Sequence, residues 1–131
     1  MKTTQKNLEF NMNVTMSKGL VVGLTLCNVG AAKVSVSDDA ILLNDMYAQY
    51  PFFFSGDLDS KCEPDSSGYQ TGKILMLPKE CLHNTWSVDR DCNFKDVAQG
   101  NYTVRFEQVI QYYEDNNSES ITLGDSASFI V

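Results

Sequence analysis

Apolar and polar residues alternate without a break from Asn7 to Met16, and this pattern constrains the fold more than any other feature of the chain. Successive side chains of a β-strand point to opposite faces, so the alternation predicts a strand with one buried face. The buried face would carry Leu8, Phe10, Met12, Val14 and Met16. The next stretch, Leu20–Cys27, alternates too but is apolar on both faces, which favours a strand in the middle of a sheet or between layers.

The longest predicted strand begins after a turn at Gly100 and Asn101 and continues to Tyr113. Val104, Phe106, Gln108 and Ile110 would share one of its faces. The other predicted strands are shorter and need this one to pair with. They cover 33–37, 40–43, 73–77 and 83–88, with a final strand or hairpin pair through 121–131.

Two segments between these strands are harder to assign. Residues 47–54 (YAQYPFFF) form either an edge strand or an apolar loop that plugs the end of the core, because three consecutive Phe cannot all face one side of a strand. Residues 55–72 form a long irregular region rich in Gly, Pro, Ser and acidic residues. A loop of that length is either functional or tied down, and Cys62 could tie it.

Helical patterns are nearly absent, and no window of about 11 residues combines an apolar stripe with capping residues. We therefore predict a single all-β domain over residues 1–131, an antiparallel β-sandwich of about seven to nine strands, with 1–6 as a flexible N-terminal tail. The predicted core contains Leu8, Phe10, Met12, Leu24, Leu26, Leu75, Trp86, Tyr102, Val104 and Phe106.

The segment Gly100-Asn101-Tyr102-Thr103-Val104 resembles the tyrosine corner of immunoglobulin-like sandwiches. The resemblance implies that Tyr102 bonds back to the backbone a few residues upstream, and that Val104 takes the place of the second core Cys. The chain departs from that family in lacking a Cys-Trp-Cys core, and Ala98 stands where an Asp would precede the Tyr. The resemblance therefore concerns the fold, which does not carry function by itself.

The net charge of −7 makes nucleic acid and anionic membranes poor partners for this chain, because its field repels phosphate groups. No apolar run approaches the ~18 residues of a membrane span, and the N-terminus lacks the apolar segment of a signal peptide. The protein is then either cytosolic or a mature form whose signal peptide has been removed. Cysteine usage favours the second, an extracytoplasmic (periplasmic or secreted) protein.

Cys27, Cys62, Cys81 and Cys92 are widely spaced and contain no C-x-x-C pair, which argues against zinc ribbons and thioredoxin-like chemistry. We expect two disulfides, the alternative being four reduced thiols packed as small apolar groups. Local geometry leans toward Cys81–Cys92, which leaves Cys27–Cys62. The rival pairing begins with Cys62–Cys81, and the sequence does not choose among the pairings.

Few residues suggest chemistry. His83, the only histidine, lies two residues from Cys81, but such positions on a strand are about 7 Å apart, too far for a nucleophile–base pair. The acidic run around Asp57, Asp59 and Asp65 is either a weak candidate for Ca²⁺ or a solvated loop, since the EF-hand spacing fails. We therefore expect no catalytic residue, no cofactor and no metal.

Two kinds of function fit these features better than catalysis. One is a non-enzymatic extracytoplasmic module that binds a protein or carbohydrate. The other is a secreted protease inhibitor that inserts the 55–72 loop into an active-site cleft. An enzyme ranks last, because none of the common nucleotide, hydrolase or metalloprotease motifs occurs. Glycosylation sequons at Asn13, Asn101 and Asn116 add weak support for export. The aromatic set formed by Tyr47, Tyr50, Phe52–Phe54, Tyr112 and Tyr113 belongs either to the core or to a recognition surface.

Overall fold

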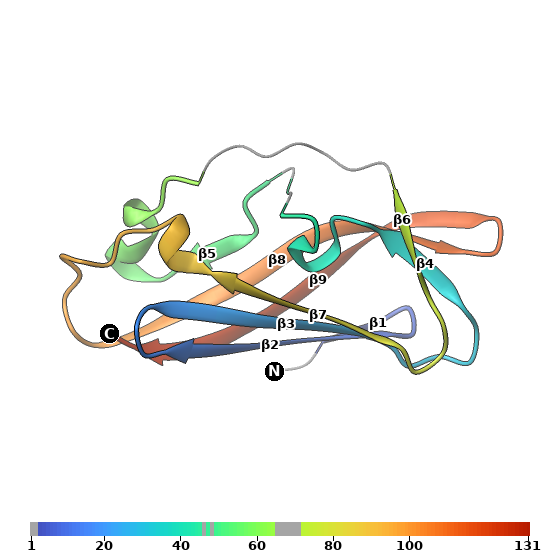
Figure 1. Cartoon of the computed structure of the whole chain (residues 1–131), viewed down its shortest axis with the longest axis horizontal. Coiled ribbons are helices and arrows are strands. Elements are labelled where there is room, and N and C mark those ends of the chain that lie inside the picture. Colours follow the sequence, from blue (N-terminus) through green and yellow to red (C-terminus); the bar gives the residue numbers. More distant parts are fainter. Residues whose placement is uncertain (1–2, 46, 48, 65–71) are drawn as a thin grey trace.

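The structure of the protein is a computed structural model that describes residues 3–45, 47, 49–64 and 72–131. Two antiparallel sheets pack against each other (Figure 1), which confirms the predicted all-β sandwich. The four-stranded sheet has the order β1 (Thr3–Gln5), β2 (Leu8–Met16), β3 (Leu20–Asn28) and β7 (Cys81–Ser87). The five-stranded sheet contains β4 (Val34–Ser37), β5 (Phe52–Phe54), β6 (Lys73–Met76), β8 (Asn101–Glu114) and β9 (Asn117–Ile130).

The long strand β8 is the centre of the five-stranded sheet. Its whole length pairs with β9, so the shorter strands β4 and β5 share its opposite edge, and β6 pairs with the far side of β4. Every second residue of β8 from Val104 to Tyr112 is buried, including Gln108, as the alternation predicted. At the adjoining edges of the two sheets, the backbone N–H of Met12 on β2 donates to Asp125 of β9 at 2.9 Å.

The core lies between the inner faces of the sheets. Phe10 of one sheet stacks on Phe106 of the other, with ring centroids 5.0 Å apart. Each large apolar side chain buried in this way contributes about 1.5–3 kcal/mol to stability. Eight of the ten predicted core residues are buried: Leu8, Phe10, Met12, Leu24, Leu26, Trp86, Val104 and Phe106.

The prediction for Leu75 is wrong. Its side chain is 56% exposed, because Met76 and the half-buried Ile74 are the residues of β6 that pack against the core. Tyr102 is half-buried, and its ring stacks on that of Phe129. Its hydroxyl donates to the carbonyl of Ala98, four residues upstream, at 2.6 Å.

Three short 3-10 helices occupy the connections: η1 (Ala40–Leu42), η2 (Gly56–Lys61) and η3 (Val88–Arg90). The predicted strand at 40–43 is wrong, since Ile41 and Leu42 of η1 both have positive φ, which no strand can accommodate. Among the described residues of the segment 47–54, only Phe52–Phe54 is a strand, and Tyr47 is buried against the rings of Tyr50 and Trp86. Residues 3–5 of the predicted tail form β1, and a single strand, β9, runs from 117 to 130.

The cysteines form two disulfides, Cys27–Cys81 and Cys62–Cys92, so the predicted pairings Cys81–Cys92 and Cys27–Cys62 are wrong. Cys27 and Cys81 are directly opposite each other on β3 and β7. Cys81 opens β7, whereas Cys92 follows its other end, and a strand of this length keeps such positions roughly 20 Å apart. Two disulfides indicate an oxidising, extracytoplasmic environment.

Candidate functional site

The five-stranded sheet is broken along one edge of β8. β5 pairs with its first half, at 104–106, and β4 with its second half, at Tyr112 and Tyr113. Between these pairings, β8 makes one hydrogen bond beyond each partner strand. The N–H of Glu107 donates to the carbonyl of Pro51, and the N–H of Gln111 donates to the hydroxyl of Ser37. We call the stretch of β8 edge at 108–110 the sheet break.

Gln108 fills the sheet break from the core side. Its Oε1 accepts the N–H of Ile41 at 2.9 Å, and its Nε2 donates to the carbonyl of Asp39 at 2.8 Å. Because the amide is buried, these bonds satisfy groups that water cannot reach. Gln108 therefore fixes the point at which the chain leaves the end of β4.

The chain then turns toward β7 of the other sheet through two residues in the left-handed region, Ile41 (φ 47°) and Leu42 (φ 59°). Such a conformation costs on the order of 1–3 kcal/mol for each non-glycine residue and persists only where the surroundings impose it. Asn84 of β7 supplies part of that constraint, since its Nδ2 donates to the carbonyls of Ile41 and Leu42 at 2.8 and 3.0 Å. η1 thus bridges β8 and β7.

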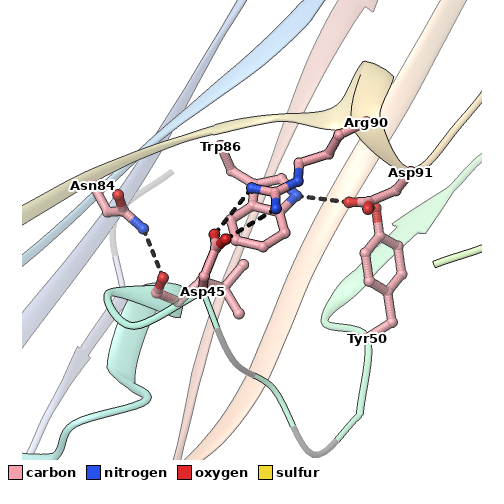
Figure 2. Close-up of polar contacts among 7 residues, drawn as sticks. Asp45, Tyr50, Asn84, Trp86, Arg90 and Asp91 are labelled. Atoms are coloured by element: carbon pink, nitrogen blue, oxygen red, sulfur yellow. Dashed lines mark hydrogen bonds and ion pairs between the residues drawn. The ribbon is translucent and has the colours of Figure 1, made fainter. Parts of the chain in front are cut away.

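A polar network joins Asp45, which follows η1, to Arg90 of η3 (Figure 2). Both carboxylate oxygens of Asp45 accept bonds of 2.9 Å from the guanidinium of Arg90, which also lies 4.4 Å from the centre of the Trp86 ring. Paired in this way, Asp45 has a pKa below its ordinary value, chiefly because of the hydrogen bond from Arg90. The pair is exposed, so it positions the chain more than it stabilises the fold.

Asp91 joins two aromatic residues from different segments. Its Oδ2 accepts the indole N–H of Trp86 at 2.8 Å and the hydroxyl of Tyr50 at 3.1 Å (Figure 2). Burial, and then the charge of Asp91, raise the pKa of Tyr50 far above its ordinary value, so the phenol stays protonated. Tyr47 packs edge-on against both rings. Tyr47 and Tyr50 are therefore fixed ahead of β5.

A hollow of about 210 Å³ opens beside the sheet break. It is lined by Asp39, Gln49, Tyr50, Phe53, Glu107, Gln108 and Val109. Phe53 and Val109 are 42% and 59% exposed, because both occupy outward positions of their strands. The hollow is thus a preformed concavity with apolar walls and an acidic rim, built from three separate segments of the chain.

The rim of the hollow already contains a cation contact. The guanidinium of Arg105 lies 4.6 Å from the centre of the Phe53 ring and 3.4 Å from a carboxylate oxygen of Glu107.

Asp39 also lines the hollow, and its Oδ1 is shielded from solvent and has no hydrogen-bond partner among the described residues. A shielded carboxylate oxygen without a donor is uncommon and calls for a physical explanation.

A second depression, of about 460 Å³, lies over the Cys62–Cys92 disulfide. Its lining comes from residues 60, 61 and 63 and from 89–93 and is polar, with Lys61 and Arg90 set among Glu63, Asp89 and Asp91. These opposite charges offset one another, and no large exposed apolar side chain lies among them. The surface therefore lacks the apolar centre that recognition sites usually have.

The residues singled out from the sequence do not gather into one site. His83 is exposed on β7, with its Nδ1 3.2 Å from the hydroxyl of Thr25, and Cys81 is bonded to Cys27. Asp57 and Asp59 lie in η2, where Asp59 accepts the N–H of Phe54, and Asp65 lies outside the described residues. Within the described ranges, no three His, Cys, Asp or Glu side chains gather closely enough to hold a metal ion.

The hollow is not predictable from the sequence, because its residues are far apart in the chain. One signal was available, since the middle residue of the Phe52–Phe54 run must face away from its neighbours. Phe52 and Phe54 are buried together with Tyr47 and Tyr112, so most of the aromatic set belongs to the core and Phe53 does not.

A comparison of the chain with protein-family models gives no match, and neither does a comparison with curated proteins. Among the residues that the structure describes, none of the helices has the length and apolar character needed to cross a membrane.

Proposed function

We propose that this protein is a non-enzymatic extracytoplasmic module, periplasmic or secreted, that binds another molecule through the hollow. The single observation that carries the proposal is the exposure of Phe53 and Val109 around a concavity built from three separate segments of the chain. Exposed apolar side chains grouped at a concave site are typical of binding surfaces, whereas scattered ones need no explanation.

The frame around the hollow supports this proposal. Gln108 holds one wall through Asp39, and the bond from Tyr50 to Asp91 holds the opposite wall. Two disulfides also constrain the fold, Cys27–Cys81 between β3 and β7 and Cys62–Cys92 between the segments after η2 and η3. A preorganised surface loses less conformational entropy on binding, which favours affinity.

We further propose that the sandwich is of the immunoglobulin-like kind. The bond from the Tyr102 hydroxyl to the carbonyl of Ala98, at the start of the central strand β8, supports this assignment. Sandwiches of this kind carry many unrelated binding functions, so the assignment is consistent with a binding module without selecting its ligand.

Photo-crosslinking tests the proposed function. The protein, carrying a photoreactive phenylalanine analogue at position 53, is added to the extracytoplasmic fraction of the source cells and irradiated. It should give a discrete cross-linked product, and the additional substitution Val109→Glu should abolish that product. The same analogue at Ile130, which is 68% exposed on β9, is the matched control and should give no such product. Equal labelling at both positions, together with a negative glycan array, would refute the proposal.

The alternative is a secreted protease inhibitor that acts through residues 55–72. The Cys62–Cys92 disulfide favours it, because the bond anchors this segment beside η3. The buried side chain of Leu58 docks the first half of the segment on the core. A panel of cysteine, serine and metalloproteases tests this function, and an absence of inhibition at micromolar protein would exclude it. Phe53→Glu should leave any inhibition unchanged, since Phe53 lies outside the loop.

A further inference from the structure

We propose that the hollow receives a basic side chain, lysine or arginine, from an exposed segment of a protein partner. This inference rests on the proposed function and names the chemistry of the ligand at that same site. Its grounds are the size of the hollow, the charges on its rim and the cation contact that the surface already makes.

The size of the hollow selects a single side chain over a free metabolite. Sites for drug-sized ligands occupy roughly 300–1,000 Å³, and this hollow measures about 210 Å³. One long side chain can enter such a volume while the rest of its segment lies on the outer face of the sheet. Phe53 and Val109 would then contact the aliphatic part of that side chain and its neighbours.

The charges on the rim select a cation. Asp39 and Glu107 both line the hollow, and the whole chain carries a net charge of −7. Asp39 is only partly buried, so its carboxylate contributes negative charge to the hollow, although its Oδ1 is itself shielded from solvent. A charged donor facing a carboxylate forms a hydrogen bond about twice as strong as a neutral pair does.

The contact between Arg105 and Phe53 indicates how a guanidinium is accommodated on this surface. The guanidinium lies over the ring at 4.6 Å and beside Glu107 at 3.4 Å, within the usual range of a cation–π contact. Because Arg105 already offsets part of the charge on Glu107, Asp39 becomes the main counter-ion for an incoming cation. Loss of the Asp39 charge should therefore weaken binding more than loss of the Glu107 charge.

A nuclear magnetic resonance titration of the oxidised, ¹⁵N-labelled protein tests this inference. The probes are the peptides acetyl-Leu-Arg-Leu-amide and acetyl-Leu-Lys-Leu-amide, and the isosteric neutral control is acetyl-Leu-citrulline-Leu-amide. The basic peptides should bind with a Kd of about 1 mM and shift the amide signals of Asp39, Phe53 and Val109. Raising the salt concentration from 20 to 500 mM should weaken that binding, since exposed charges are screened.

Variants assign the effect to the acidic rim. Asp39→Asn should weaken binding of the arginine peptide by about tenfold, and Glu107→Gln, which alters an exposed group, by less than Asp39→Asn. Asp96→Asn removes an exposed acid away from the hollow and should change nothing. Equal binding of the citrulline peptide would overturn the inference but leave the proposed function standing. An absence of shifts with either basic peptide in 20 mM salt would also overturn it. The proposed function is refuted separately, by equal cross-linking from positions 53 and 130 together with a negative glycan array.

Discussion

Gln108 and Asn84 lie on opposite sheets, and both bind the peptide groups of Ile41. Gln108 accepts its N–H at 2.9 Å, and Asn84 donates to its carbonyl at 2.8 Å. Ile41 is a β-branched residue with positive φ, which is unfavourable without such support. The two amides therefore connect the sheets through a strained turn and hold the chain that forms one wall of the hollow.

Gln108→Leu should lower the free energy of unfolding by about 2–4 kcal/mol, because the N–H of Ile41 and the carbonyl of Asp39 would both lose a buried partner. The measurement is urea denaturation followed by the fluorescence of Trp86, the single tryptophan. Gln111→Leu is the matched control, since its side chain lies exposed on the same strand and donates to the hydroxyl of Ser120. Equal effects of the two substitutions would contradict the role assigned to Gln108.

Tyr102→Phe should cost about 1 kcal/mol, since it removes the hydroxyl that binds the carbonyl of Ala98. The denaturation midpoint measures this cost. Tyr113→Phe removes a hydroxyl from the same strand, where the ring packs against Lys73, and should cost less. An unchanged midpoint for Tyr102→Phe would remove the support for an immunoglobulin-like corner.

Peptide mapping without reduction should recover the pairs Cys27–Cys81 and Cys62–Cys92 and neither of the other two pairings. In the chain-entropy account, loops of 54 and 30 residues correspond to about 4.2 and 3.6 kcal/mol of stability. Replacing both cysteines of either pair by Ala should therefore lower the free energy of unfolding by several kcal/mol. Four thiols that alkylate freely in the native protein would disprove both bonds.

Stability should fall as pH rises above about 10, because of Tyr50. Its pKa in the folded protein is raised above the ordinary value of 10.0, so the unfolded chain releases the phenolic proton before the folded chain does. The contribution is complete below pH 10 and is lost as the pH increases beyond it. Denaturation midpoints between pH 8 and 11 measure this loss, and Tyr50→Phe should flatten it.

Absorbance of tyrosinate gives an independent check on Tyr50. Alkaline titration of the folded protein should leave a protonated tyrosine among the six until unfolding occurs. Complete titration of all six near pH 10, with the fold intact, would show that Asp91 and burial do not hold the proton on Tyr50.

The sequence by itself determined most of the strands and the class of fold, although it predicted a strand at 40–43 where the chain forms η1 and did not indicate β1. Strict alternation from Asn7 to Met16, and again along β8, defines a buried and an exposed face, and two such faces are stable only when they pack together. The same alternation identified most of the core, because every second residue of a strand points to the same face of the sheet. The alternation failed for Leu75, because in a strand as short as β6, with consecutive apolar residues, it does not show which of them face the core.

Only the tertiary structure decided the disulfide pairing, the turn at Ile41 and the hollow. Cys27 and Cys81 become partners through the register of β3 with β7, which depends on how distant segments pair. The positive φ of Ile41 is imposed by two amides that lie 43 and 67 residues away. Asp39, Phe53 and Val109 meet because β4 and β5 divide one edge of β8 between them. Each depends on contacts between segments that are distant in the sequence, and no local pattern encodes such contacts.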